Sequence, residues 1–238
     1  MALSRRDFGK RVLAGIAATS VAGTAGCGTS DGSGGSAGIA GSSGSGGNGG
    51  SNACVLYPRQ TEGPFYLDLD SVRENITEGK IGAALRMVVQ VQDQNCSPLK
   101  DLAVDVWHCD AGGIYSGFSG QLGGLDTTGM TFLRGMQVTD ADGVAAFETI
   151  YPGWYPGRTT HIHFKVHASS STEATSQIYF PDDVTAGVHE TAPYDVRGQK
   201  DTPNSADGIA VADPTPLAVV TGDSESGYAA TVVVTIAS

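Results

Sequence analysis

The sequence is short of positive charge, of long apolar runs and of helical periodicity, and each shortage narrows what the chain can be. Lysine and arginine number 14 against 25 aspartates and glutamates, which gives a formal net charge of −11 and a pI near 4.7. Such a surface repels phosphate groups, so we expect no nucleic acid partner. Apolar residues still make up 40% of the 238 positions, enough for the core of one folded domain.

The first uncharged run, Val12–Gly26, is rich in alanine, glycine and threonine. It is too short to cross a bilayer, because a membrane-spanning helix takes roughly 20 residues, and these must be more apolar than the ones found here. Ahead of it stands Ser4–Lys10, with paired arginines followed by a phenylalanine. The two segments together resemble a twin-arginine export signal. We therefore predict that residues 1–26 are a removable signal peptide and that the protein is periplasmic or at the cell surface.

A candidate lipid-attachment site closes this signal. Thr24–Cys27 resembles a bacterial lipoprotein cleavage box, in which Cys27 carries the lipid anchor. Leucine is usual at the position of Thr24, so cleavage without lipidation stays open. Residues 27–53 are almost entirely Gly, Ser, Ala, Asn and Thr, and they have too little apolar surface to offset the entropy of ordering them. We expect a flexible linker there.

From Cys54 to Ser238 the signals are those of short strands separated by Gly, Pro and Asp, without a convincing period of 3.6. The pattern predicts two hairpins, which pair residues 85–93 with 102–108 and residues 132–139 with 144–149. Further strands are expected over residues 161–167, 177–180, 209–211, 217–221 and 229–236, and a short helical turn over 71–78. The domain 54–238 is therefore predicted to be all-β, a β-sandwich of mainly antiparallel strands with long active-site loops.

Three cysteines, Cys54, Cys96 and Cys109, remain once Cys27 is set aside for the lipid. An odd number allows at most one internal disulfide. Cys96 and Cys109 stand at opposite ends of a predicted strand of about seven residues, roughly 23 Å apart, which is too far for a bond. We therefore expect Cys54 to pair with one of the other two.

Two histidines stand within the segment richest in chemically active side chains, Tyr151–Phe164. Side chains alternate along a strand, so His161 and His163 point to one side while Ile162 and Phe164 face the core. Neutral imidazole is the commonest metal ligand, and the pair is a candidate metal site. The spacing alone is equally compatible with two surface or hydrogen-bonded histidines.

Five segments carry a further pattern, in which a glycine-rich turn presents Tyr115 and a Pro-Gly-x-Tyr-Pro motif presents Tyr155. They are Thr61–Tyr66, Val104–Phe118, Pro152–Pro156, Arg158–His163 and Gln177–Phe180. Together they resemble the intradiol ring-cleavage dioxygenases, the catechol and protocatechuate 3,4-dioxygenase superfamily. The likeness covers most of residues 54–185 and is nearest to an exported branch.

The resemblance implies a non-haem Fe(III) cofactor held by Tyr115, Tyr155, His161 and His163. Phenolate oxygen is a hard donor that suits Fe(III), and a trivalent ion drives a phenol with an ordinary pKa near 10 to ionise at neutral pH. Both tyrosines lie in loops, where ordinary aromatic roles are common. Their joint occurrence beside the histidine pair favours the ligand role.

The resemblance also implies a reaction, in which O2 cleaves the ring of a catechol-type aromatic between its two hydroxylated carbons and gives a muconate-type diacid. Tyr155 would take up a proton from the substrate, and Arg158 would stabilise negative charge that builds on the ring. Gln177 would hydrogen-bond the ring or orient a ligand, with a plain strand role as the alternative.

Two other functions stay open on the sequence. One is an exported β-sandwich binding module that keeps the dioxygenase fold without turnover. The other is a blue-copper site built from His161, His163 and Cys109, which leaves both tyrosines and Arg158 unused. No cysteine or methionine follows Met136, so the usual C-terminal copper cluster is missing. We expect His108 to pack beside Trp107 rather than bind the metal.

Overall fold

A computed structural model of the protein describes residues 54–168, 173–211 and 217–237. The predicted signal peptide 1–26, the linker 27–53 and the lipid site at Cys27 lie outside the described residues. Among the residues that are described, no helix is both long and apolar enough to cross a membrane.

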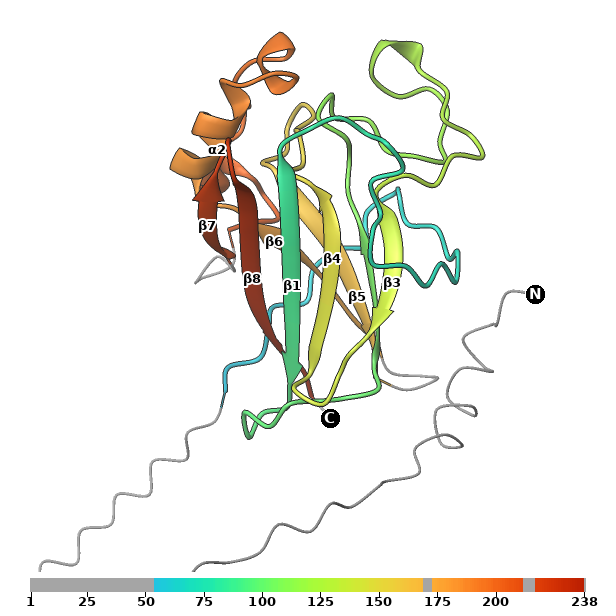
Figure 1. The fold of residues 1–238 in the computed structure, drawn as a ribbon, viewed down its shortest axis with the longest axis vertical. Coiled ribbons are helices and arrows are strands. Elements are labelled where there is room, and N and C mark those ends of the chain that lie inside the picture. Colours follow the sequence, from blue (N-terminus) through green and yellow to red (C-terminus); the bar gives the residue numbers. More distant parts are fainter. Residues whose placement is uncertain (1–53, 169–172, 212–216, 238) are drawn as a thin grey trace, which may run out of the picture. The chain divides into compact units, whose positions relative to one another are not determined.

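Two four-stranded sheets pack face to face (Figure 1). One sheet has the strand order β4-β1-β8-β7 and the other has the order β3-β2-β5-β6. The strands are β1 (Ala84–Gln92), β2 (Ala103–Trp107), β3 (Arg134–Val138), β4 (Val144–Ile150), β5 (His161–His167), β6 (Glu173–Tyr179), β7 (Val219–Asp223) and β8 (Gly227–Thr235). One α-helix, α2 (Asp182–His189), and three short 3-10 helices, η2 (Leu122–Gly124), η3 (Tyr194–Val196) and η4 (Asn204–Ala206), are described beside them.

The core lies between the sheets because the apolar side chains alternate along the strands. In β1, Met87, Val89 and Val91 are at most 1% exposed while their neighbours point outward. In β5, Ile162 and Phe164 face them from the other sheet and are also buried. Two inward faces of this kind make one shared core, which is the physical reason for a sandwich. The predicted all-β sandwich is confirmed, and only the β1–β8 pair is parallel among the pairings of the described strands.

Both predicted hairpins are wrong, although their turns are present. β1 pairs with β4 and β8, whereas β2 pairs with β3 and β5 in the other sheet. β3 and β4 are likewise divided between the two sheets, and the turn that joins them is closed by a 3.0 Å hydrogen bond from the Gly143 N–H to the Asp140 carbonyl. Alternation shows which side of a strand is apolar and says nothing about its hydrogen-bonded neighbour, so a turn between sheets resembles a turn within one.

Two local predictions are also wrong, and one helix was not predicted. Residues 71–78 form no helical turn; Val72 and Asn75 instead make isolated bridges to Met136 and Glu148 at the sheet edges. Residues 209–211 form no strand. The helix α2 was missed because its eight residues cover too few turns for a periodic signal, and its buried face is mixed, with Thr185 and Val188 among the buried residues.

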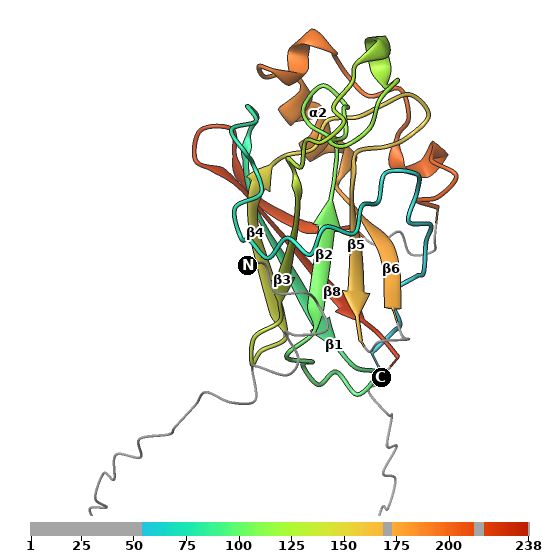
Figure 2. The same cartoon turned by 90° about the vertical axis from the view of Figure 1, so that its right-hand side faces the viewer.

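A segment without regular structure, residues 57–66, crosses the outer face of the β3-β2-β5-β6 sheet (Figure 2). Lys165, on the outward side of β5, pairs with Glu62 in this segment. The backbone N–H of Gln60 donates to the Thr175 carbonyl at the edge strand β6 over 3.0 Å. The segment therefore covers the side of the sheet that carries both predicted histidine ligands.

Just before the covering segment, Cys54 forms a disulfide with Cys96, and Cys109 is a free, buried thiol. The expectation that Cys54 takes part in the one bond is confirmed. The bond ties the chain just before the segment to the turn after β1.

We predict that the double substitution Cys54→Ala/Cys96→Ala lowers the free energy of unfolding by about 3–4 kcal/mol, since the bond closes a loop with a sequence separation of 42. Urea denaturation measures the loss. Reduced wild-type protein should fall to the same stability, and Cys109→Ala should keep the wild-type response to reductant. An oxidised double variant as stable as the wild type would contradict the prediction.

Candidate metal centre

Strand β5 places two imidazoles side by side on the covered outer face. His163 lies opposite Trp107 of β2 and Gln177 of β6 in the sheet register, and His161 precedes it by two residues on the same face. Both histidines are at most 2% exposed. Their Nε2 atoms are 3.1 Å apart, so the two rings converge on one point.

Two phenol groups reach the same point from different loops. The Oη atom of Tyr115 lies 3.4 Å from Nε2 of His161, and the Oη atom of Tyr155 lies 3.2 Å from the same nitrogen. The four residues predicted as metal ligands, Tyr115, Tyr155, His161 and His163, are thus brought together by the structure. They come from the loop after β2, the loop before β5 and β5 itself.

The two tyrosine loops meet at a glycine. Gly113 has a φ of +82°, and a Cβ atom there would lie 2.2 Å from the Trp154 carbonyl oxygen. Only glycine permits both this backbone conformation and this approach. The close contact holds the turn before Tyr115 against the residue before Tyr155, and this sets the spacing of the two phenols.

Arg134 fixes the Tyr115 side of the site. Its guanidinium group donates to the Ser116 Oγ atom over 2.7 Å, to the Ser116 carbonyl over 2.7 Å and to the Phe65 carbonyl over 2.6 Å. The Phe65 ring stacks on the Tyr115 ring with centroids 4.3 Å apart. Arg134 therefore joins the covering segment, through Phe65, to the loop that carries Tyr115, through Ser116.

The histidine rings are oriented by different contacts. Nδ1 of His161 lies 2.7 Å from the Thr159 carbonyl, which can only accept, so Nδ1 carries the hydrogen and Nε2 presents its lone pair. His163 is instead stacked on Trp107, with ring centroids 5.1 Å apart and planes 9° apart. Nδ1 of His163 is buried and has no hydrogen-bond partner among the described residues. Gly63 lies close to the Cε1 atom of this ring, which stands between its two nitrogens: a Cβ atom at Gly63 would be 3.2 Å from Cε1.

Burial keeps all four groups neutral. It lowers the pKa of His161 to about 3, with the nearby Arg158 charge acting in the same direction, and it lowers the pKa of His163 well below its ordinary value. Burial also raises the pKa of Tyr115 well above 10 and that of Tyr155 to about 12. Neutral imidazoles are ready to bind a cation, and the phenols need the cation to ionise.

The donor set fits a metal ion. Nε2 of His161 has one lone pair, yet three polar atoms lie 3.1–3.4 Å from it, so protein hydrogen bonds alone do not use this arrangement fully. Donors about 2.1 Å from an ion and about 90–110° apart are separated by about 3.0–3.4 Å, which matches these distances. A centre with three or more His, Cys, Asp or Glu ligands is not found among the described residues, so this His/Tyr set is the candidate.

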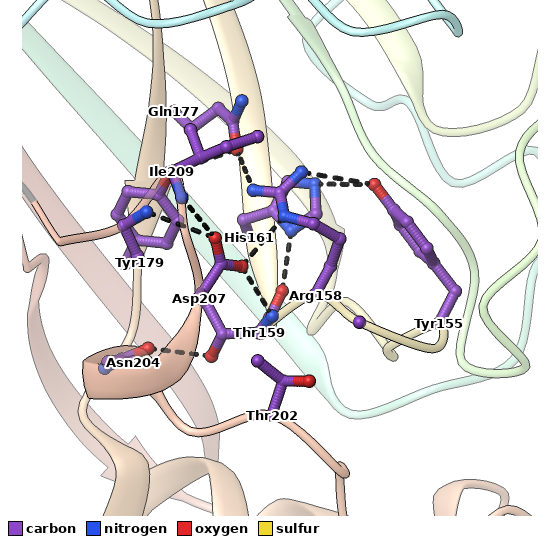
Figure 3. Close-up of polar contacts among 12 residues, drawn as sticks. Tyr155, Arg158, Thr159, His161, Gln177, Tyr179, Thr202, Asn204, Asp207 and Ile209 are labelled. Atoms are coloured by element: carbon purple, nitrogen blue, oxygen red, sulfur yellow. Dashed lines mark hydrogen bonds and ion pairs between the residues drawn. The ribbon is translucent and has the colours of Figure 1, made fainter.

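Arg158 and Gln177 form one network beside the phenols (Figure 3). Arg158 bonds Gln177 Oε1 through Nη2, and its Nη1 lies 3.5 Å from the Tyr155 Oη atom. Gln177 is held in turn by the Thr61 carbonyl, which accepts from its Nε2 over 3.0 Å. On its other side, Arg158 donates from Nε to the Oδ2 atom of Asp207 over 2.8 Å.

The sequence analysis included Gly63 and Phe65 in the motif Thr61–Tyr66 without giving either a role, and it did not single out Asp207 or Arg134. Arg134 is the one cation in β3, but nothing in that strand marks its contacts with the Tyr115 loop. Asp207 leaves no signal either, because an Asp-Gly pair in a loop is read first as a turn. His108 takes a structural role, since its Nδ1 lies 2.8 Å from the Cys109 carbonyl and its Nε2 lies 2.7 Å from a threonine hydroxyl.

The fold and the site define a β-sandwich with a candidate metal centre of two histidines and two tyrosines. A family model described as Dioxygenase matches residues 61–192. A solved intradiol ring-cleavage dioxygenase from Tetranychus urticae is 32% identical, with a TM-score of 0.70, and the match covers 77% of this chain and 95% of that one. The dioxygenase domain of a carbohydrate-binding fusion protein from Streptomyces sp. SirexAA-E is 30% identical, with a TM-score of 0.58 and coverage of 77% and 99%.

Among curated relatives, the protocatechuate 3,4-dioxygenase beta chain of Burkholderia cepacia is 32% identical over 139 residues, which are 54% of this chain and 57% of the relative. The chain therefore spans somewhat over half the length of this relative. The chain belongs to the intradiol ring-cleavage dioxygenase superfamily, as its sequence motifs predicted.

We predict that Gly63→Ala weakens metal binding by on the order of tenfold or more, because the new Cβ atom would lie 3.2 Å from Cε1 of His163 and push the ring aside. Gly79→Ala is the matched control. Gly79 also has a positive φ, +77° against +71° at Gly63, but a Cβ atom there meets nothing within 4 Å. Both variants should lose about 1–2 kcal/mol of stability from backbone strain.

Calorimetric titration of the metal-free proteins with a metal salt separates the two effects. Equal affinities for the Gly63 and Gly79 variants would show that His163 is not held by this contact.

Proposed function

We propose that the protein is a non-haem Fe(III) dioxygenase that cleaves the ring of a catechol-type aromatic between its two hydroxylated carbons. O2 is the co-substrate and both oxygen atoms enter the product, a muconate-type diacid. The observation that carries the proposal is that the Oη atoms of Tyr115 and Tyr155 and the Nε2 atom of His163 all lie 3.1–3.4 Å from Nε2 of His161. Membership of the intradiol superfamily supports the reaction class.

The donor set suits a trivalent ion for a reason of charge. Two phenolates supply two negative charges and two neutral imidazoles supply none, so a ferric ion would be largely neutralised in a site that is almost dry. Bound there, a ferric ion would withdraw electron density from a catechol-type substrate and so activate its ring toward O2. The protein's part is to hold the donors, exclude water and place charge and protons.

The two tyrosines are not equivalent. Tyr115 is 0% exposed and pinned under the Phe65 ring, whereas Tyr155 is partly exposed and lies beside the cationic Arg158. Tyr115 is therefore the fixed ligand. Tyr155 is the one that can leave when a catechol arrives, and its phenol oxygen can then hold a substrate proton.

Arg158 supplies a fixed positive charge at the rim of the site. It is held between Asp207 and Gln177 before any substrate is present, so no reorganisation is needed when negative charge builds on the ring. Gln177 directs its carbonyl oxygen at Arg158, and this favours a positioning role for Gln177.

We also propose that the domain works after export by the twin-arginine route, in the periplasm or at the cell surface, with Cys27 as its lipid anchor. The Cys54–Cys96 disulfide supports an oxidising compartment. Export of an already folded domain would allow iron to be loaded beforehand.

We expect iron-loaded protein to consume O2 and form a diacid with at least one member of a panel of catechol, protocatechuate, hydroxyquinol and lignin-derived diphenols. Tyr155→Phe should lower kcat by on the order of 10²–10⁴-fold, because its phenol serves as both ligand and proton acceptor. An oxygen electrode and product mass spectrometry measure both quantities.

Tyr228→Phe is the matched control, since Tyr228 lies on β8 in the other sheet and should keep wild-type turnover. If fully iron-loaded wild-type protein binds catechols and consumes no O2 with any of them, the protein is a binding module that keeps the fold without turnover, and the proposal is wrong.

A further inference from the structure

A buried carboxylate outside the predicted site organises the residues before β5. Asp207 follows η4 and is 0% exposed. Its Oδ2 atom accepts from Nε of Arg158 over 2.8 Å and from the backbone N–H of Thr159 over 2.8 Å. Its Oδ1 atom accepts from the backbone N–H groups of Ile209 over 2.8 Å and Ala210 over 3.1 Å. Four donors thus surround one carboxylate (Figure 3).

The two donors on Oδ2 belong to adjacent residues with different tasks. Arg158 carries the charge proposed to face the substrate. The carbonyl of Thr159 accepts a hydrogen bond from Nδ1 of His161 over 2.7 Å. By accepting a hydrogen bond from the Thr159 N–H, the carboxylate restrains the backbone on one side of Thr159, and the carbonyl on the other side of this residue sets the tautomer of a proposed iron ligand. One oxygen atom therefore controls the orientation of both groups.

The other end of the clamp is rigid. Oδ1 is held by its own loop through Ile209 and Ala210, so the carboxylate cannot rotate toward solvent without losing two further hydrogen bonds. An Asx-type turn of this kind is common, but here its second oxygen is used across the domain by residues 48 and 49 positions away. The turn thus holds Oδ2 in position to accept hydrogen bonds from Arg158 and Thr159.

Without Oδ2, the Arg158 guanidinium keeps one close hydrogen bond, to Gln177, and weaker contacts with the hydroxyl groups of Tyr155, at 3.5 Å, and Tyr179. An arginine side chain has several rotatable bonds, and one remaining strong hydrogen bond does not restrict them all. Charge-assisted hydrogen bonds to a buried carboxylate are among the strongest in proteins, so Asp207 is the dominant restraint on Arg158.

We propose that Asp207 is a positioning residue for ring cleavage, which acts mainly by clamping Arg158 toward the site and also restrains the backbone of Thr159, the residue whose carbonyl orients His161. The inference rests on the proposed dioxygenase function. Asp207 touches neither the proposed iron nor the substrate, and it acts through those two neighbours.

Asp207→Asn tests the clamp in the iron-loaded enzyme. The amide turns one acceptor into a donor, so either the Arg158/Thr159 side or the Ile209/Ala210 side faces a mismatched N–H group. We expect kcat to fall by on the order of 10–100-fold with KM changed less than threefold. Asp201→Asn is the control, because Asp201 is exposed and, among the described residues, accepts from the Gly157 N–H over 3.3 Å and from the Thr202 hydroxyl over 2.7 Å.

A double-mutant cycle separates positioning from general structural damage. If Asp207 acts mainly through Arg158, adding Asp207→Asn to Arg158→Met should cost less than threefold beyond Arg158→Met alone. A full second loss of 10–100-fold in the double variant would overturn the proposal. Wild-type kcat in the single Asp207 variant would also overturn it.

Asp207→Glu covers the case in which the asparagine variant does not fold. Glutamate keeps the charge and both acceptors but advances them by one methylene, so the fold should survive while the guanidinium is displaced. We expect kcat to fall by at least threefold, and unchanged kcat would contradict the clamp.

A readout without turnover keeps the clamp distinct from the activity. In ¹⁵N-labelled, metal-free protein the Nε–H signal of Arg158, assigned by its loss in Arg158→Met, should exchange with solvent at least tenfold faster in Asp207→Asn than in wild type. If the Arg158 Nε–H exchanges slowly in wild type and faster in Asp207→Asn, but no catechol is turned over, the proposed function is wrong and the clamp is supported. Equal exchange rates in the two proteins would overturn the clamp whatever the activity.

Discussion

The candidate metal centre depends on the two-residue repeat of one strand. Because side chains alternate along β5, the same stretch that buries Ile162 and Phe164 in the core must present His161 and His163 on the opposite face. A one-residue slip of β5 against β2 and β6 would bury both imidazoles among apolar side chains and expose the core residues. The stability of the sandwich therefore fixes the position of the histidine pair.

The covering segment turns this face into a closed site. Residues 57–66 lie over β5, with Gly63 against His163 and Phe65 against Tyr115. Polar groups removed from water are costly unless they are paired, by about 1–3 kcal/mol each. The single lone pair of His161 Nε2 faces three polar atoms and cannot serve them all, and a cation in the proposed site would relieve this crowding. The neutral state of all four groups is the form that this arrangement favours.

A feature of this protein could be predicted where its signal lies within a few neighbouring residues of the sequence. Strand alternation is local, so the sandwich class, the histidine face and the core positions Ile162 and Phe164 were predictable. Strand partners depend on packing between distant segments, and the two expected hairpins failed for that reason. The tyrosines were found only through a family pattern, because a loop residue has no periodicity to place it.

The residues that orient the site were not predictable from one sequence. Asp207 reaches Arg158 and Thr159 across 49 and 48 positions of chain, and nothing in its own neighbourhood marks it as more than a turn residue. Arg134 and Gly63 act by contacts that exist only after the covering segment has packed. Ligand types can thus be inferred from local motifs, whereas the supporting contacts need the fold.

The central claim is that two imidazoles and two phenols hold a single ferric ion. Anomalous diffraction at the iron absorption edge, from crystals of iron-loaded protein, tests it most directly. The account predicts one strong peak within about 2.0–2.4 Å of the Oη atoms of Tyr115 and Tyr155 and the Nε2 atoms of His161 and His163. A peak elsewhere in the protein, or one beyond bonding distance of either tyrosine, would contradict it.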